Sequence, residues 1–132
     1  MSKYKASGLA ESIKFAIRGL FLTFKSQKNF RIECFIAFAV AIAAYILHLT
    51  CIEISILVFA VALILFAELT NTVVEFIVDA YFGNKYSILA KMAKDTSAGA
   101  VFMISLFSVL IGTLLFLPKI IVLLKTLVVL NH

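Results

Sequence analysis

Three long apolar stretches dominate the pattern of hydrophobic and polar positions. Residues 34–52 and 96–118 contain no Asp, Glu, Lys or Arg, and residues 54–78 are interrupted by only a few polar side chains. A helix that crosses a bilayer needs about 20 mostly apolar residues. The pattern therefore predicts an all-α integral membrane protein, with transmembrane helices over about 32–52, 54–82 and 94–118.

The segment before the first span has an amphipathic pattern. Its apolar residues recur at helical spacing, and its charged residues fall on another face. We expect a surface helix over about 8–28 on the cytoplasmic leaflet, and the pattern alone favours a simple membrane anchor as its role. The apolar set is Leu9, Ile13, Ile17, Leu20 and Phe24, and the charged set is Glu11, Lys14, Arg18 and Lys25.

The connections between the spans differ in length. Glu53 alone separates the first two spans, which predicts a tight turn near Leu49–Glu53. The second connection, Asp79–Asp95, is longer and polar, with a turn signal at Gly83-Asn84. Residues 119–132 are too few for a further crossing, so we expect this tail to extend the third helix beyond Pro118 or to lie at the interface.

Composition supports a membrane protein. The 132 residues are 64% hydrophobic and 14% charged, with a mean hydropathy of +1.13. Soluble domains carry about 45–50% apolar and about 25% charged residues, which excludes an ordinary water-soluble globule. The length predicts a single domain over residues 1–132.

Charge is distributed unevenly along the chain. There are 12 Lys and Arg against 7 Asp and Glu, and seven of the basic residues precede residue 32. With no nucleic-acid-binding motif beside them, we expect no nucleic acid partner, and attribute the bias to anionic lipid on the cytoplasmic side. It predicts a multi-pass protein with the N-terminus and the second connection in the cytoplasm, and the first turn outside.

The second span contains an acidic stripe. At about 100° per residue, Glu68, Asn71, Glu75 and Asp79 project along one side of a helix over about 16 Å. A carboxylate at a helix centre costs about 2.5–3.5 kcal/mol on insertion scales, so these acids need a compensating metal ion, lysine or proton. Polar contacts between helices are the simpler alternative.

Lys94 and Asp95 open the third span at a depth similar to that of Glu75 and Asp79. Lys94 either pairs with the acids or holds a phosphate against a metal that they bind. No P-loop motif, Ser/His/Asp constellation or Cys/His cluster is present in the sequence.

Two sequence segments carry a family resemblance. ELTNTVVEFIVD from Glu68 to Asp79, followed by AKDTSAGAV from Ala93 to Val101, closely resembles the prokaryotic diacylglycerol kinase/undecaprenol kinase family. Asn29-Phe30-Arg31 and the residues 116–119 are similar too, the latter to the Gram-positive undecaprenol kinase branch. The resemblance covers roughly residues 9–120.

This resemblance implies a homotrimer in the bacterial cell membrane, with three spans and an N-terminal surface helix. It implies transfer of the γ-phosphoryl group of ATP to a lipid alcohol at the cytoplasmic face, with Mg²⁺ as cofactor. The implied roles are general base for Glu68, metal and nucleotide binding for Glu75, support for Asn71 and Asp79, and nucleotide binding for Tyr86, Lys94 and Asp95.

One position departs from the family pattern. Gln27 stands where well-known members have a second metal-ligating Glu. An amide oxygen can bind Mg²⁺ without the charge, so we keep Gln27 in the predicted metal and nucleotide site with weakened metal affinity. Glu33 is a possible replacement, although on one continuous helix it would point about 120° away. Because the weaker metal affinity could abolish activity, one interpretation of the sequence is a catalytically inactive member of the family.

Three functions stay open at this point. The first is an undecaprenol kinase that makes undecaprenyl phosphate, and the second is a diacylglycerol kinase that makes phosphatidic acid. The third is a non-catalytic ion or proton pathway, or an assembly subunit.

Overall fold

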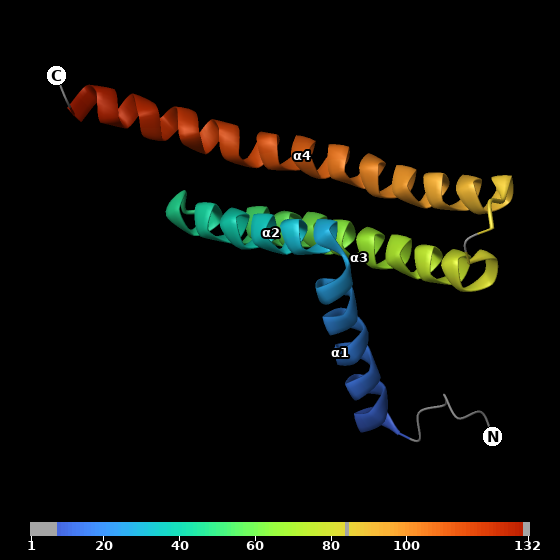
Figure 1. The fold of residues 1–132 in the computed structure, drawn as a ribbon. Coiled ribbons are helices and arrows are strands. Elements are labelled where there is room, and N and C mark those ends of the chain that lie inside the picture. The colour runs from blue at the N-terminus through green and yellow to red at the C-terminus, as the bar shows by residue number, and fades with distance from the viewer. Residues whose placement is uncertain (1–7, 84, 131–132) are drawn as a thin grey trace.

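The computed structural model describes residues 8–83 and 85–130, and helices are the only regular secondary structure in these residues. Figure 1 shows the helices α1 (Leu9–Ser26), α2 (Lys28–Ile46), α3 (Cys51–Phe82) and α4 (Ile88–Leu130). In this described part, α2, α3 and α4 are each long and apolar enough to cross a membrane. The predicted all-helical fold with three membrane-compatible helices is confirmed.

The helix α1 leaves the bundle at a steep angle, whereas α2, α3 and α4 run alongside one another (Figure 1). Gln27 creates the corner, because its extended backbone (φ −103°, ψ 117°) ends α1 and begins α2. The Arg31 guanidinium then donates to the carbonyls of Phe24 and Lys25, at 3.1 and 2.9 Å. A cation on the last carbonyls of a helix satisfies free acceptors and complements the dipole.

The turn between α2 and α3 lies earlier than predicted. The helix α2 ends at Ile46, and α3 already begins at Cys51, so the expected first span over 32–52 is too long at its C-terminal end. Thr50 and Glu53 form a capping box, in which each side chain accepts from the other's backbone N–H. That motif marks a helix start, and it makes residues 51–52 part of α3.

The helix α4 is longer than the predicted third span. It begins six residues before residue 94 and continues through Pro118 to Leu130, a length of about 64 Å. The tail therefore extends the third helix, which is one of the two alternatives stated above. Asn84, half of the predicted turn signal, lies outside the described residues.

Two carboxylates on α3 mark the ends of a membrane-sized bundle. Glu53 and Glu75 are about 33 Å apart along the helix axis, close to the hydrocarbon thickness of about 30 Å. We call these levels the Glu53 boundary and the Glu75 boundary. At the Glu53 boundary, Lys119 of α4 forms an ion pair with Glu53 at 3.1 Å.

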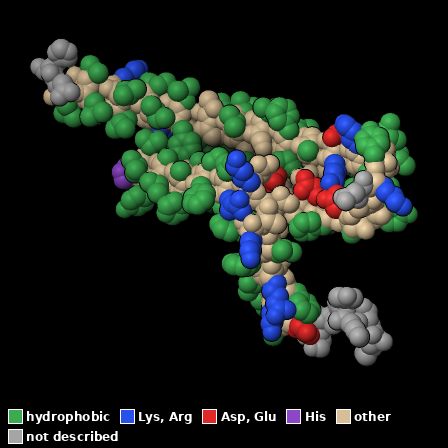
Figure 2. All heavy atoms as spheres, viewed as in Figure 1, with side chains coloured by type: hydrophobic (Ala, Val, Ile, Leu, Met, Phe, Trp, Pro, Cys, Tyr) green, Lys and Arg blue, Asp and Glu red, His purple; other side chains and the backbone are tan. Residues whose placement is uncertain are grey.

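The bundle has little interior of its own. A small cluster of Ala44, Leu49 and Leu57 is buried near the Glu53 boundary, while most large apolar side chains are exposed. Figure 2 shows this apolar surface over the bundle, with acidic and basic side chains gathered near the point where α1 departs. A lipid environment would cover the apolar surface.

Candidate active site

The acidic stripe predicted on α3 runs from the bundle interior to its surface at the Glu75 boundary. The side chains of Glu68 and Asn71 are buried, with 3% and 9% exposed, whereas Glu75 is half-buried and Asp79 is exposed. Asn71, Glu75 and Asp79 contact residues at the beginnings of α2 and α4. The stripe therefore forms one side of a site at the membrane boundary.

Two amides hold the Glu75 carboxylate. Gln27 Nε2 donates to Glu75 Oε2 at 3.1 Å, and Asn71 Nδ2 lies 3.5 Å from Glu75 Oε1. Gln27 reaches this position because it stands at the corner between α1 and α2. The structure thus brings together the two residues predicted to bind metal, although they are 48 positions apart.

Ser97 is a member of this cluster that the sequence reasoning missed. Its hydroxyl donates to Asn71 Oδ1 at 2.6 Å, which turns the amide nitrogen of Asn71 toward Glu75. A helical spacing of three residues places Ser97 on the same face as Lys94. This spacing is the feature of the sequence from which the position of Ser97 could have been predicted.

The predicted Lys94 and Asp95 pair is divided between two partners. Lys94 Nζ lies 2.5 Å from Asp79 Oδ1 and so joins the acidic stripe. Asp95 instead pairs with Lys91 on its own helix. Tyr86 is exposed in the connection between α3 and α4. The structure therefore places Lys94 in the cluster but leaves Asp95 and Tyr86 at its margin.

Glu33 does not join Gln27 and Glu75. Its carboxyl group interacts electrostatically with Glu68, and Glu68 in turn interacts with Glu75. Within the described part of the chain, Glu33 Oε2 is buried and has no hydrogen-bond partner. A buried polar atom without a partner is costly, so this oxygen is available to a group that enters beside it.

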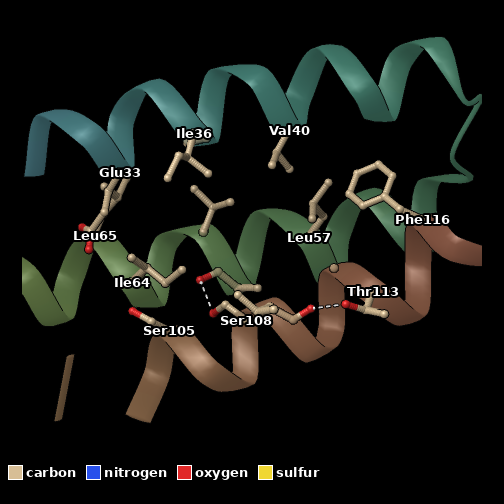
Figure 3. A pocket seen from close by; sticks show the side chains of 15 residues that line it. Glu33, Ile36, Val40, Leu57, Ile64, Leu65, Ser105, Ser108, Thr113 and Phe116 are labelled. Atoms are coloured by element: carbon tan, nitrogen blue, oxygen red, sulfur yellow. Dashed lines mark hydrogen bonds between the residues drawn. The ribbon is translucent and has the colours of Figure 1, made fainter. Parts of the chain in front are cut away.

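An apolar groove of about 380 Å³ begins at Glu33 and runs between α2, α3 and α4 to Phe116. Figure 3 shows Glu33 at one end, with Ile64 and Leu65 next to it. The hydroxyls of Ser105, Ser108 and Thr113 donate to backbone carbonyls, so they are already satisfied. The groove therefore presents an almost entirely hydrocarbon lining that ends at a carboxyl group.

The residues at the Glu75 boundary suit a metal that also binds a substrate. No group of three His, Cys, Asp or Glu side chains in the described ranges is arranged to enclose a metal ion. Mg²⁺ needs no such enclosure, because it is commonly held by one or two carboxylates together with substrate phosphates. The Glu75 carboxylate and the amide oxygen of Gln27 fit this pattern once the Gln27 amide turns over.

Comparison with known proteins places this site in a family. Residues 14–116 match the family described as prokaryotic diacylglycerol kinase. The chain is 41% identical over 113 residues to the diacylglycerol kinase of Synechocystis sp., a match that covers 86% of this chain and 65% of that protein. It is 38% identical over 109 residues to the undecaprenol kinase of Bacillus subtilis, covering 83% of this chain and 88% of that protein.

A third relative, the diacylglycerol kinase of Haemophilus influenzae, is 36% identical over 102 residues, with 75% of this chain and 86% of that protein covered. The matched region contains the whole acidic stripe, Gln27, Lys94 and the groove. The chain belongs to the prokaryotic diacylglycerol kinase family, a family of lipid kinases.

Proposed function

We propose that this protein transfers the γ-phosphoryl group of ATP to undecaprenol and so makes undecaprenyl phosphate, with Mg²⁺ as cofactor. The observation that carries the proposal is a juxtaposition. An apolar groove ends at Glu33. Glu33 interacts electrostatically with Glu68, and Glu68 with Glu75, which belongs to the polar cluster of Gln27, Glu75 and Lys94. A lipid alcohol and a phosphate donor could meet there.

Glu68 is the proposed general base. It is almost fully buried and interacts electrostatically with Glu33 at the groove end and with Glu75 of the polar cluster. We therefore assign it the proton of a hydroxyl group brought in by a lipid chain. Glu68 takes the hydroxyl proton, the alcohol oxygen bonds to the γ-phosphorus, and the bond from that phosphorus to the bridging oxygen of ADP breaks. Proton transfer by a positioned side chain contributes about 10²–10⁴-fold to a rate.

The residues on the nucleotide side of the site act through their charge and by positioning the phosphates. Phosphoryl transfer depends mainly on these two effects. Glu75 and Gln27 would hold Mg²⁺, which when bound neutralises charge on the phosphates. Lys94 exchanges its ion pair with Asp79 for a phosphate, and Asn71 orients Glu75. We keep Asp95 and Tyr86 as outer contacts of the nucleotide.

The groove favours undecaprenol over diacylglycerol. Undecaprenol is a hydrocarbon chain that ends in one hydroxyl group, whereas diacylglycerol also has two ester groups. Because the groove hydroxyls already donate to backbone carbonyls, they have no hydrogen left for ester oxygens. Diacylglycerol would bury those acceptors unsatisfied, at a cost in affinity.

Phosphorylation assays with each lipid test this proposal. The purified protein in detergent micelles, with ATP and Mg²⁺, should phosphorylate undecaprenol faster than diacylglycerol. A preference for diacylglycerol would establish the alternative substrate. Phosphorylation of neither lipid, together with no magnesium-dependent ATP binding, would favour a non-catalytic ion pathway or assembly subunit and reject the kinase proposal.

We also propose that the protein is a homotrimer in the bacterial cell membrane, with the Glu75 boundary on the cytoplasmic side. The orientation is supported by the basic residues of α1 and by Lys85, Lys91 and Lys94, which all lie at the same end of the bundle as Glu75. The trimer is supported by the family resemblance. Chemical crosslinking in native membranes should give dimers and trimers of the chain and no larger species.

A further inference from the structure

The last part of α4 lies beyond the bundle. The ion pair of Lys119 with Glu53 marks the level at which α4 passes the Glu53 boundary. Residues 120–130 continue the helix for about 16 Å more, and Figure 1 shows the C-terminal end of α4 reaching past the turn between α2 and α3. These residues also follow the family match, which ends at residue 116. We call them the 120–130 extension.

The extension is too apolar to project into water. Nine of its eleven residues are Ile, Leu or Val, and between 40% and 76% of each of these side chains is exposed. Each Å² of apolar surface that is removed from water lowers the free energy by about 25 cal/mol. The extension therefore requires a covering surface that residues 8–83 and 85–130 do not supply.

The arrangement of its side chains indicates what covers it. At about 100° per residue, Lys119, Lys125 and Thr126 fall within an arc of about 120°. The opposite arc, about 180° wide, contains only apolar side chains. Those side chains are Ile120, Ile121, Leu123, Leu124, Leu127, Val128 and Leu130.

We propose that the 120–130 extension lies along the membrane surface at the Glu53 boundary, with its Ile and Leu arc in the acyl region and its lysine arc toward anionic headgroups. An apolar face opposite a basic face is typical of an interfacial helix. Residues 119–130 contain two lysines and no acid, a charge that suits an anionic lipid surface. The apolar arc also continues the lipid-facing surface of α4.

Pro118 permits the change of direction that this placement requires. Proline has no backbone N–H, so the carbonyl of Leu114 lacks its usual helical partner there. Pro118 lies inside α4, one residue before the last contact with the bundle. The helix can therefore bend in the turn that ends at Pro118, just before the extension, at little further cost.

A tryptophan scan tests the placement, because the chain contains no Trp of its own. Leu124→Trp and Leu127→Trp place a reporter on the apolar arc, and Val122→Trp and Val129→Trp place one on the lysine arc. Each full-length variant is reconstituted in nanodiscs of phosphatidylcholine and phosphatidylglycerol. The first pair should be quenched by lipids brominated near the headgroup, and the second pair by aqueous acrylamide.

Phe107→Trp is the matched control, because residue 107 is an exposed position in the middle of the span. It should be quenched by lipids brominated deep in the chain. Equal acrylamide quenching at all four extension positions would place the helix in water, and equal deep quenching would place it across the membrane. Shielding of all four from both quenchers would indicate a second copy or another protein, and each of these results overturns the proposal.

Discussion

At the scale of single residues, Glu75 and Gln27 form a hydrogen bond where the family pattern has two carboxylates. Two carboxylates at this separation repel each other unless a cation lies between them. The amide of Gln27 instead donates to Glu75 at 3.1 Å, so the corner between α1 and α2 is held together without a metal. On the proposed function, Gln at this position should lower the affinity for Mg²⁺ and stabilise the metal-free site.

Gln27→Glu should therefore raise the affinity of the site for Mg²⁺ and lower the stability of the protein when Mg²⁺ is absent. We expect the concentration of Mg²⁺ required for half-maximal activity to fall, because a second charged oxygen joins Glu75. The thermal midpoint without Mg²⁺ should fall as well, because the hydrogen bond is replaced by repulsion. Kinase assays and thermal melts across a magnesium titration measure both effects.

Lys28→Glu is the control for that experiment, since residue 28 is adjacent but exposed. It adds the same charge without facing Glu75. An unchanged magnesium requirement in Gln27→Glu, or an equal shift in Lys28→Glu, would remove residue 27 from the metal site.

Glu68→Gln tests the proposed base at the end of the groove. The amide has nearly the same shape but cannot take a proton, so we expect turnover to fall by about 10²–10⁴-fold while lipid binding persists. Glu53→Gln, on the same helix at the opposite boundary, should keep its turnover because Gln also serves in a capping box. Similar turnover in Glu68→Gln and the unmodified protein would exclude the base role.

At the scale of helices, the sequence predicted the extent and the faces of single helices better than the rotation of one helix against another. The apolar pattern predicted three spans, and the spacing of the acids predicted one stripe on α3, because both depend only on the helical repeat. The contact of Ser97 with Asn71 and the electrostatic interaction of Glu33 with Glu68 depend on how α2 and α4 are rotated against α3. That rotation is set by packing between helices, which periodicity does not determine.

The end of α2 illustrates the same difference. An uninterrupted apolar run through residue 52 predicted a longer first span, whereas the structure ends the helix at Ile46. The capping signal of Thr50 and Glu53 was present in the sequence, but apolar residues on both sides of it concealed the boundary. Short polar motifs therefore decide helix ends even within membrane segments.

Thr50→Ala should weaken the start of α3. The alanine cannot accept the N–H of Glu53, and loss of a helix N-cap costs about 0.5–2 kcal/mol. We expect a lower midpoint in denaturation of the protein in micelles, followed by circular dichroism. Thr50→Ser keeps the accepting oxygen and should retain the midpoint, so an equal loss in both variants would contradict a capping role.

At the scale of the whole molecule, the position of the site follows from the distribution of charge and length. The groove lies between the two boundaries, and the polar cluster lies at the Glu75 boundary together with the basic residues of α1. In the proposed reaction, the lipid acceptor would arrive from the bilayer and the nucleotide from the aqueous side. Cellular ATP can reach the polar cluster only if the Glu75 boundary faces the cytoplasm.

The native cysteines provide a direct test of that orientation. Cys51 is exposed at the start of α3, near the Glu53 boundary, whereas Cys34 is half-buried in α2. In a Cys34→Ala variant, a membrane-impermeant maleimide should label Cys51 on intact cells, because the Glu53 boundary faces outward in the proposed orientation.

In a chain with Cys34→Ala, Cys51→Ala and Ser87→Cys, the only thiol lies in the α3–α4 connection and should react only after permeabilisation. The reverse pattern would place the polar cluster outside the cell, away from ATP, and would contradict both the orientation and the proposed kinase reaction.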